Sequence, residues 1–513
     1  MATPQQEAVT KIDEISIKAF SSHYQPGSPR IASLDAIKGV AVLFGLIISI
    51  YVWGGFSDGM QNQLIGQSNG IRHSIYVLAS FFFEGKMRGL ISLAFGAGMI
   101  LFLLKSHPAS SVSNGELMVR RSMWLMVFGV VNAFVFLWPQ DVLFHLGIMG
   151  LLLFPFPRMN TRWLFISVVI ISLIGVGKNY WYFADDQKAY GKYVVIQKLE
   201  KKFSADSAAR MKTKDSSLFK KRQAGAAGVN DSIANSKIND SLAKKAGDTL
   251  TRKQKDEKQA WEGIAKRYKY EAKNDSGNIK ALQANSYSKN WDQILQQSKN
   301  RESTWFYQNG VWEFAALILL GMFLFKIGFF SGRFSQGQYM IMATSFIILG
   351  LLCAWYRLHF QKVSITDYTL FVKTRAAPSS LLWPFERAFL VTGIAAKIVW
   401  ATQSRMFSRF YSIFVDVGRL ALTNYLMQSI FLSLFFYGYG MGYFARIGHY
   451  KLYFLVAEVC VVQIVFSVFW LRYYYFGPAE WLLTSLMYKK KMPFRRKETE
   501  TELFQEQPLP SAI

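Results

Sequence analysis

Apolar residues in this chain occur in blocks of about 20, separated by short polar segments. A helix of that length crosses the hydrocarbon core of a bilayer, so each block predicts a membrane-spanning helix. The second block is too long for one straight span and is expected to tilt or to break at Gly85 or Gly89. The pattern predicts an all-α polytopic membrane protein with about ten spans, near residues 35–55, 75–104, 120–138, 141–157, 162–183, 306–327, 337–358, 381–401, 411–437 and 451–473.

A long polar stretch, residues 184–304, divides the spans into two groups of five. Its sparse apolar residues predict amphipathic helices at each end and a disordered centre around residues 225–239. A solvated appendage is the simpler interpretation, and binding to a partner or to the envelope is the alternative. The expected organisation is residues 1–34 as a cytoplasmic segment, 35–183 as the first membrane half, 184–304 as an extracytoplasmic insert, 305–488 as the second membrane half, and 489–513 as a basic cytoplasmic tail.

The net charge of +26 does not indicate nucleic-acid binding, because the basic residues lie in loops, in the insert and in the tail after Tyr488. A basic cluster beside a membrane span is typical of a cytoplasmic anchor on anionic lipid. The short loops carry more Lys and Arg on one side, which predicts that the N and C termini both lie in the cytoplasm. Cys353 and Cys460 fall inside spans, so neither a disulfide scaffold nor a metal site is expected.

Three charged residues, Glu84, Lys86 and Arg88, fall near the middle of the second span. Charges at that depth are costly and normally face a protein interior or a wet cavity. They are therefore candidate substrate-binding residues. The alternative is a set of internal ion pairs that only fixes helix packing.

Two further groups of polar residues lie within spans. Asp141 and His145 are one turn apart on the same helix face, as a general base and its partner would be. Asp141 is equally suited to capping the start of its helix. Arg419, Asn424 and Gln428 are candidate binding residues in the ninth span, although Asn and Gln also join membrane helices by hydrogen bonds. Depth suggests an outward-facing polar vestibule formed by Asp141, His145, Glu313, Glu386, Arg387 and Glu458, with the Glu84 group at its floor.

Sequence signatures of soluble nucleotide-binding and hydrolase sites are absent from the chain. Four stretches stand out instead: Arg30 with Leu34–Gly39; Glu84–Lys86 with Leu93–Gly98; Arg120-Arg121 with Leu137-Trp138 and Asp141–Leu143; and Gly418–Ser429 with Phe436–Gly440 and Phe476–Trp481. Together they resemble the motifs of the YeiB-like bacterial inner-membrane proteins, a family of unknown function.

The first of these motifs is similar to that of membrane acyltransferases of the heparan-glucosaminide N-acetyltransferase type. This resemblance implies an acyl donor such as acetyl-CoA on the cytoplasmic side and an envelope glycan or lipid acceptor on the other. His145 with Asp141 would then be the base, and Lys86, Arg88 and Arg419 would hold phosphate or carboxylate groups. The chain departs from its relatives at Lys38, Ser49 and Asn132, where they commonly have Arg, Asn and His.

Two other functions remain open at this point. A transporter would line a path with its buried charges, and it commonly has two related halves, of which the sequence gives no convincing sign. A non-catalytic envelope scaffold predicts that the Glu84 and His145 sites are dry and internally paired. The enzyme predicts that Arg30, Asp35, Lys38 and Arg419 border an inner pocket that meets an outer one.

Overall fold

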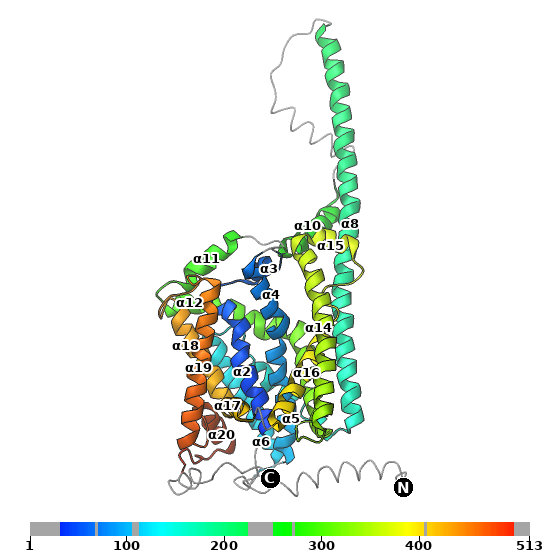
Figure 1. The fold of residues 1–513 in the computed structure, drawn as a ribbon. Coiled ribbons are helices and arrows are strands. Elements are labelled where there is room, and N and C mark those ends of the chain that lie inside the picture. Colours follow the sequence, from blue (N-terminus) through cyan, green and yellow to red (C-terminus); the bar gives the residue numbers. More distant parts are fainter. Residues whose placement is uncertain are drawn as a thin grey trace, which may run out of the picture. The chain divides into compact units, whose positions relative to one another are not determined.

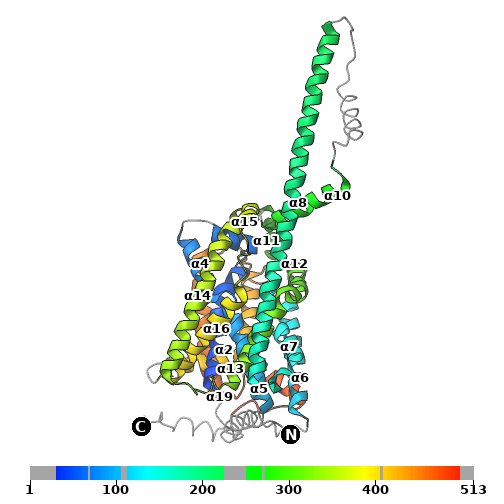
Figure 2. The same cartoon turned by 90° about the vertical axis from the view of Figure 1, so that its right-hand side faces the viewer.

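The computed structural model describes residues 31–66, 70–104, 112–223, 250–268, 272–404 and 408–496. The N-terminal segment up to residue 30, the expected disordered centre of the insert and the tail after residue 496 lie outside these residues. The described chain is helical (Figures 1 and 2), with one isolated bridge between Tyr474 and Arg495.

The helices bear the labels of Figure 1. They are α2 (Ala32–Trp53), α3 (Asp58–Gly66), α4 (Ile71–Phe83), α5 (Lys86–Leu104), α6 (Asn114–Phe134), α7 (Leu143–Leu152), η1 (Phe156–Arg158), α8 (Thr161–Gln223), α10 (Arg252–Tyr268), α11 (Ala272–Leu282), α12 (Tyr287–Asn300), η2 (Arg301–Gly310), α13 (Val311–Lys326), α14 (Gln336–Thr366), α15 (Tyr368–Thr374), α16 (Trp383–Gln403), α17 (Ser408–Arg419), α18 (Ala421–Phe436), α19 (His449–Tyr473) and α20 (Pro478–Tyr488).

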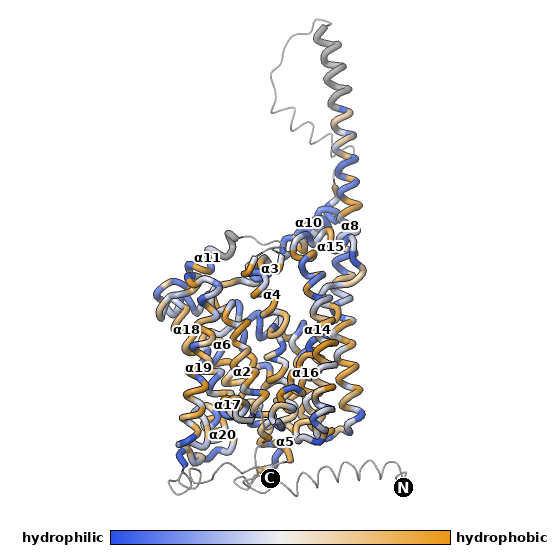
Figure 3. The backbone as a smooth tube through the Cα atoms, in the orientation of Figure 1, coloured by the Kyte–Doolittle hydropathy of each residue, from blue (hydrophilic) through white to orange (hydrophobic). Residues whose placement is uncertain are grey.

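Seven helical segments of the described chain are long and apolar enough to cross a membrane. The shorter apolar helices α7 and α18 coincide with expected spans, and α16 occupies the span expected at 381–401. Apolar residues run along these helices, whereas α10 and α11 are mainly hydrophilic (Figure 3). The expected all-α polytopic membrane fold is therefore confirmed.

The described residues form two compact units. The first contains those up to Gly177, those of Glu271–His359 and those from Ser380 onward. Its central helix is α2, which contacts α4, α5, α16, α17, α18 and α19. Within this unit α11 and α12 lie at the opposite end of the bundle from α17 and α20 (Figure 1).

Glycines allow two pairs of helices to cross at backbone distance. A Cβ on Gly39 of α2 would lie 2.0 Å from the carbonyl oxygen of Phe414 in α17, and one on Gly418 would lie 1.7 Å from that of Asp35. The crossing of α5 and α13 depends in the same way on Gly96 and Gly321. Close approach at small residues is the usual way in which membrane helices gain packing energy, because lipid offers no hydrophobic drive.

The long second block breaks at Gly85, which is one of the outcomes that the sequence left open beside a tilt or a break at Gly89. α4 ends at Phe83 and α5 begins at Lys86, and Gly85 between them has φ of 72°. Residues with a side chain rarely adopt that left-handed conformation, so glycine is favoured there. A Cβ would also lie 2.5 Å from the Arg387 guanidinium, so the break brings the α5 N-terminus against α16.

The expected ninth span, 411–437, consists of two helices that break at Leu420. The first turn of α18 has amide groups without helical partners, and Glu480 of α20 accepts hydrogen bonds from the amides of Leu422 (2.7 Å) and Thr423 (3.1 Å). A carboxylate at a helix N-terminus is also favoured by the helix dipole. The sequence shows one continuous apolar block here, because the cap comes from a residue 58 positions away.

The second unit contains the described parts of Lys178–Tyr270 and of Phe360–Ser379. It has its own small core of Phe183, Trp261, Tyr368, Phe371 and Val372. The expected insert, residues 184–304, is therefore not one unit, although its composition is polar throughout. Residues 272–304 belong to the first unit, because Asn290 and Ile294 of α12 are buried there and Tyr287 bonds the Val135 carbonyl oxygen at 2.8 Å.

Candidate functional site

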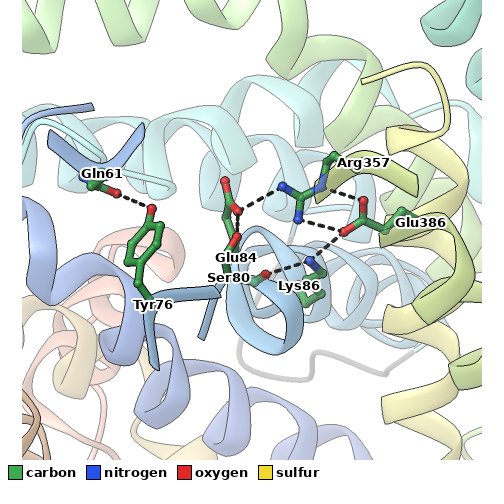
Figure 4. Close-up of polar contacts among 7 residues, drawn as sticks. All are labelled: Gln61, Tyr76, Ser80, Glu84, Lys86, Arg357 and Glu386. Atoms are coloured by element: carbon green, nitrogen blue, oxygen red, sulfur yellow. Dashed lines mark hydrogen bonds and ion pairs between the residues drawn. The ribbon is translucent and has the colours of Figure 1, made fainter. Parts of the chain in front are cut away.

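Four charged side chains form a closed network beside the Gly85 break (Figure 4). Lys86 Nζ lies 2.7 Å from Glu386 Oε1, and Arg357 Nε lies 2.8 Å from Glu386 Oε2. Arg357 also reaches Glu84 at 3.3 Å, and Ser80 donates a hydrogen bond to Glu84. The Lys86 and Glu386 side chains are 0% exposed. Two cations and two carboxylates satisfy one another here, which is the arrangement that the packing alternative predicts.

Arg88 belongs to a second network. Its guanidinium makes a bidentate contact with Glu313 at 3.0 and 3.1 Å and lies 5.2 Å from the Trp305 ring centroid. Arg387 pairs with the same carboxylate and stacks on Trp383. Planar guanidinium groups suit this shared recognition of one carboxylate. Arg88 keeps partial exposure and, unlike Lys86, lines a cavity.

Asp141 accepts a hydrogen bond from the Phe144 amide in the first turn of α7 at 2.8 Å, which is the capping role that the sequence left open beside a place in a site. Its other oxygen accepts one from the Asn132 amide group at 2.7 Å. The His145 ring contacts the backbone oxygen of Asp141 through Nδ1 at 3.0 Å, and its Nε2 lies 3.1 Å from a carboxylate oxygen of Glu302. His145 is fully buried among aromatic rings, including that of Phe306 at 4.7 Å.

Tyr425 of α18 makes hydrogen bonds to Asp141 and to two residues close to it in the chain. Its hydroxyl oxygen accepts hydrogen bonds from the Trp138 indole and the Val142 amide, both at 3.2 Å. The hydroxyl donates in turn to Asp141 Oδ1 at 3.4 Å. The Tyr425 side chain is therefore held in one orientation by three different groups.

A cavity of about 410 Å³ lies beside the N-terminal end of α2. Apolar residues of α2, α5, α7 and α20 line most of its wall. Its charged lining residues are Asp35, Lys38, Arg121, Arg419 and Glu480. Three of the four residues that the sequence assigns to an inner pocket are thus present, and Arg30 lies outside the described residues. We call this the inner cavity.

Two further cavities follow along α2. The middle cavity, about 100 Å³, is lined by Ser49, Arg88 and Gln428 and shares Val42, Ile91, Val142 and Tyr425 with the inner cavity. The outer cavity, about 350 Å³, lies between the C-terminal end of α2 and helices α11 and α12, and it shares Gln140 with the middle one.

One helix borders all three cavities in order. The lining positions of α2 run from Leu34 through Val42 to Val52. At 1.5 Å per residue this path is about 27 Å long, close to the thickness of the hydrocarbon core. The cavities therefore follow one another across most of the bundle.

The predicted site residues divide into two groups. Arg88, Arg419 and Gln428 line cavities. Glu84, Lys86, Asp141, His145 and Asn424 are not among the lining residues of the described cavities.

Asn424 and Gln428 both make hydrogen bonds between helices. Asn424 bonds Ser467 at 2.9 Å, and Gln428 bonds Gln463 at 2.9 Å and the Val42 carbonyl at 3.1 Å. Glu458, expected in the vestibule, is exposed because α19 turns its neighbours Leu455 and Val459 inward instead. The vestibule therefore does not include Glu458.

Four residues that shape these networks and cavities were not predicted from the sequence: Arg301, Glu302, Arg357 and Tyr425. Arg357 lies near the end of the expected span 337–358, and a charge inside a span would have marked it as a candidate site residue. Arg301 and Glu302 looked like the last residues of a polar insert. They begin η2, a π-helix over Arg301–Gly310, a form of helix that often occurs at functional sites.

Comparison with known proteins gives similarity but no activity. Residues 324–490 match the model of a family described as a protein of unknown function (DUF418). The chain is 23% identical to the uncharacterized protein YxaH of Bacillus subtilis over 484 residues, covering 91% of this chain and 96% of that protein. It is 30% identical to the uncharacterized protein YeiB of Escherichia coli over 185 residues, covering 36% of this chain and 46% of YeiB.

No solved structure matches the chain. The match to the family model runs from the last residues of α13 through α20 and includes the broken α17–α18 segment and the Glu480 cap. The resemblance of this multi-pass membrane protein to the YeiB-like family of uncharacterised function is thereby confirmed.

Proposed function

We propose that this protein is a transmembrane acyltransferase-like enzyme of the bacterial inner membrane, with its termini in the cytoplasm. It moves an acyl group from a cytoplasmic acyl-CoA, such as acetyl-CoA, to an envelope glycan or lipid. The observation that carries the proposal is the row of three cavities along α2, because donor and acceptor must meet from opposite sides of the membrane.

The inner cavity has the chemistry that an acyl-CoA needs. Its wall is apolar, which suits the long arm that carries the thioester, and Lys38, Arg121 and Arg419 supply cations for phosphate groups. Arg121 lies 5.4 Å from the Phe95 ring centroid. An amphipathic anion therefore fits this cavity better than a small hydrophilic solute does.

The narrow middle cavity favours transfer of a group over passage of a whole solute. At about 100 Å³ it is much smaller than the cavities on either side, which measure about 410 and 350 Å³. Tyr425, held by its hydrogen bonds, lines the boundary between the inner and middle cavities. An acyl group of a few heavy atoms fits such a constriction, whereas a CoA-sized molecule does not.

The transfer step is assigned to Tyr425 and Asp141. The acceptor hydroxyl or amine attacks the thioester carbonyl and loses its proton to Asp141 through the Tyr425 hydroxyl. The C–S bond breaks as the new bond forms, and the proton ends on the CoA sulfur. His145, whose ring bonds the Asp141 backbone, is a positioning residue in this proposal.

Calorimetric titration of acetyl-CoA into the purified protein in nanodiscs tests whether acetyl-CoA is the donor. We expect the wild type to bind and Lys38→Ala to weaken binding about tenfold, because a charge-assisted contact to phosphate is lost. Gly98→Leu should also weaken binding, since a Cβ there meets no atom within 4 Å and the side chain would fill the inner cavity. Arg333→Ala, which removes an exposed cation, is the control.

Absence of acetyl-CoA binding by the wild type would contradict the proposal. So would wild-type affinity in both Lys38→Ala and Gly98→Leu. Proteoliposomes loaded with doubly labelled acetyl-CoA separate transfer from transport. We expect the acetyl label alone to reach an acceptor on the other side, whereas passage of the intact molecule would favour a transporter.

A further inference from the structure

The outer cavity differs from the inner one in the chemistry of its wall. Among the described residues that line it, Arg301 carries the only charge. Four aromatic side chains contribute apolar surface. Five others can exchange hydrogen bonds without a charge: Ser57, Gln140, Asn278, Gln297 and Asn300.

Arg301 is poorly neutralised by the acidic residues nearest to it. Both oxygens of Glu313 are engaged by Arg88 and Arg387, and Glu302 lies against His145. Nε and Nη2 of Arg301 are buried and have no hydrogen-bond partner among the described residues. Leaving such donors unsatisfied is costly, so this cation favours an anionic partner in the cavity that it lines.

Trp305 fixes the direction of this guanidinium. The Arg301 Cζ atom lies 3.2 Å from the Trp305 ring centroid, and Trp305 also lines the outer cavity. The same ring lies 5.2 Å from Arg88, which lines the middle cavity. Stacking orders the Arg301 side chain before any ligand arrives, which lowers the entropy cost of binding.

We propose that the outer cavity binds a small polyhydroxylated molecule through an oxyanion held by Arg301. The amide side chains of Gln140, Gln297 and Asn300 would bond its hydroxyl groups, and the aromatic wall would cover its ring. That this molecule is the acyl acceptor rests on the proposed function. The geometry suits that role, because Gln140 lines both the outer and the middle cavity. Binding itself needs no acyl donor.

The probes that test this site are glucuronate, glucose 6-phosphate and glucose, each titrated into the protein in nanodiscs. We expect both anionic sugars to bind, and glucose to bind at least about tenfold more weakly because it lacks the oxyanion. Arg301→Gln should weaken binding of the anionic sugars to the level of glucose. Arg301→Lys should restore part of the affinity, and a preference between the two anionic sugars distinguishes carboxylate from phosphate.

Arg446→Gln is the matched control, since Arg446 is an exposed arginine in the loop next to the lining residue Phe444. Equal affinity of the wild type and Arg301→Gln for both anionic sugars would overturn the proposal. Binding of acetate or inorganic phosphate as tight as that of the sugars would overturn the role of the amide side chains. Sugar binding that survives while acetyl-CoA fails to bind would contradict the acyltransferase function and leave this site standing.

Discussion

Glu386→Ala is expected to lower the free energy of unfolding by about 3–5 kcal/mol, the usual cost of breaking a buried ion pair. Glu386 is the carboxylate shared by Lys86, at 2.7 Å, and Arg357, at 2.8 Å. Its removal leaves two buried cations with Glu84 as the remaining acid of the network. Thermal unfolding in nanodiscs, followed by tryptophan fluorescence, measures the effect.

A matched exposed pair provides the control for this prediction. Glu257→Ala removes the partner of Lys192, at 3.1 Å, where the Lys192 side chain is 60% exposed. A surface pair contributes about 1 kcal/mol or less. The double variant Lys86→Met with Glu386→Gln should recover part of the loss, because neither charge is then left alone. A Glu386→Ala effect no larger than that of Glu257→Ala would show that the network does not stabilise the fold.

Gly96→Ala is expected to destabilise the protein by about 3 kcal/mol, the upper range for overpacking a core. A Cβ on Gly96 would lie 1.9 Å from the Ile318 carbonyl oxygen, so the backbones of α5 and α13 must separate. Backbone atoms cannot rotate away as a side chain can. The same unfolding measurement gives the size of the effect.

Gly98→Ala, two residues further along the same helix, is the control for Gly96→Ala. A Cβ at Gly98 meets no atom within 4 Å, and alanine favours a helix over glycine by about 1 kcal/mol. We expect Gly98→Ala to be neutral or slightly stabilising. Equal destabilisation by the two variants would mean that helix propensity or lipid contact, and not the α5–α13 crossing, governs this region.

These variants also separate charges that hold the bundle from charges that serve the proposed site. Lys86 and Lys38 are both lysines near acidic partners, but Lys86 is enclosed by its network whereas Lys38 lines the inner cavity beside Asp35. Lys86→Met should therefore reduce stability with little change in acetyl-CoA affinity once the protein is folded. Lys38→Ala should weaken acetyl-CoA binding with little change in stability.

Much of the fold follows from local features of the sequence. Apolar block length predicted helical spans, Gly85 marked the break between α4 and α5, and Asp141 stood where a helix cap was needed. Each of these depends on residues that are neighbours in the chain. The Glu480 cap on α18 escaped prediction because its donor amides and its carboxylate lie far apart in sequence.

The candidate site was only partly visible in the sequence. Depth in the membrane identified Arg88 and Arg419 as charges that need an environment, and both line cavities. It could not separate them from Lys86, which has the same apparent depth as Arg88. From the sequence, Arg301 belonged to a solvated insert. It lies at the outer cavity because α12 packs against the bundle, and the sequence does not reveal that packing.

The sequence by itself determined that this is an all-α polytopic membrane protein with costly charges inside its spans, because hydropathy and block length act locally. Only the tertiary structure decided which of those charges pair with each other and which border a cavity. That outcome depends on which helices meet and on the rotation of each helix about its axis. Contacts such as Gly39 with α17 and Gly96 with α13 set both, and they join residues that are distant in the chain.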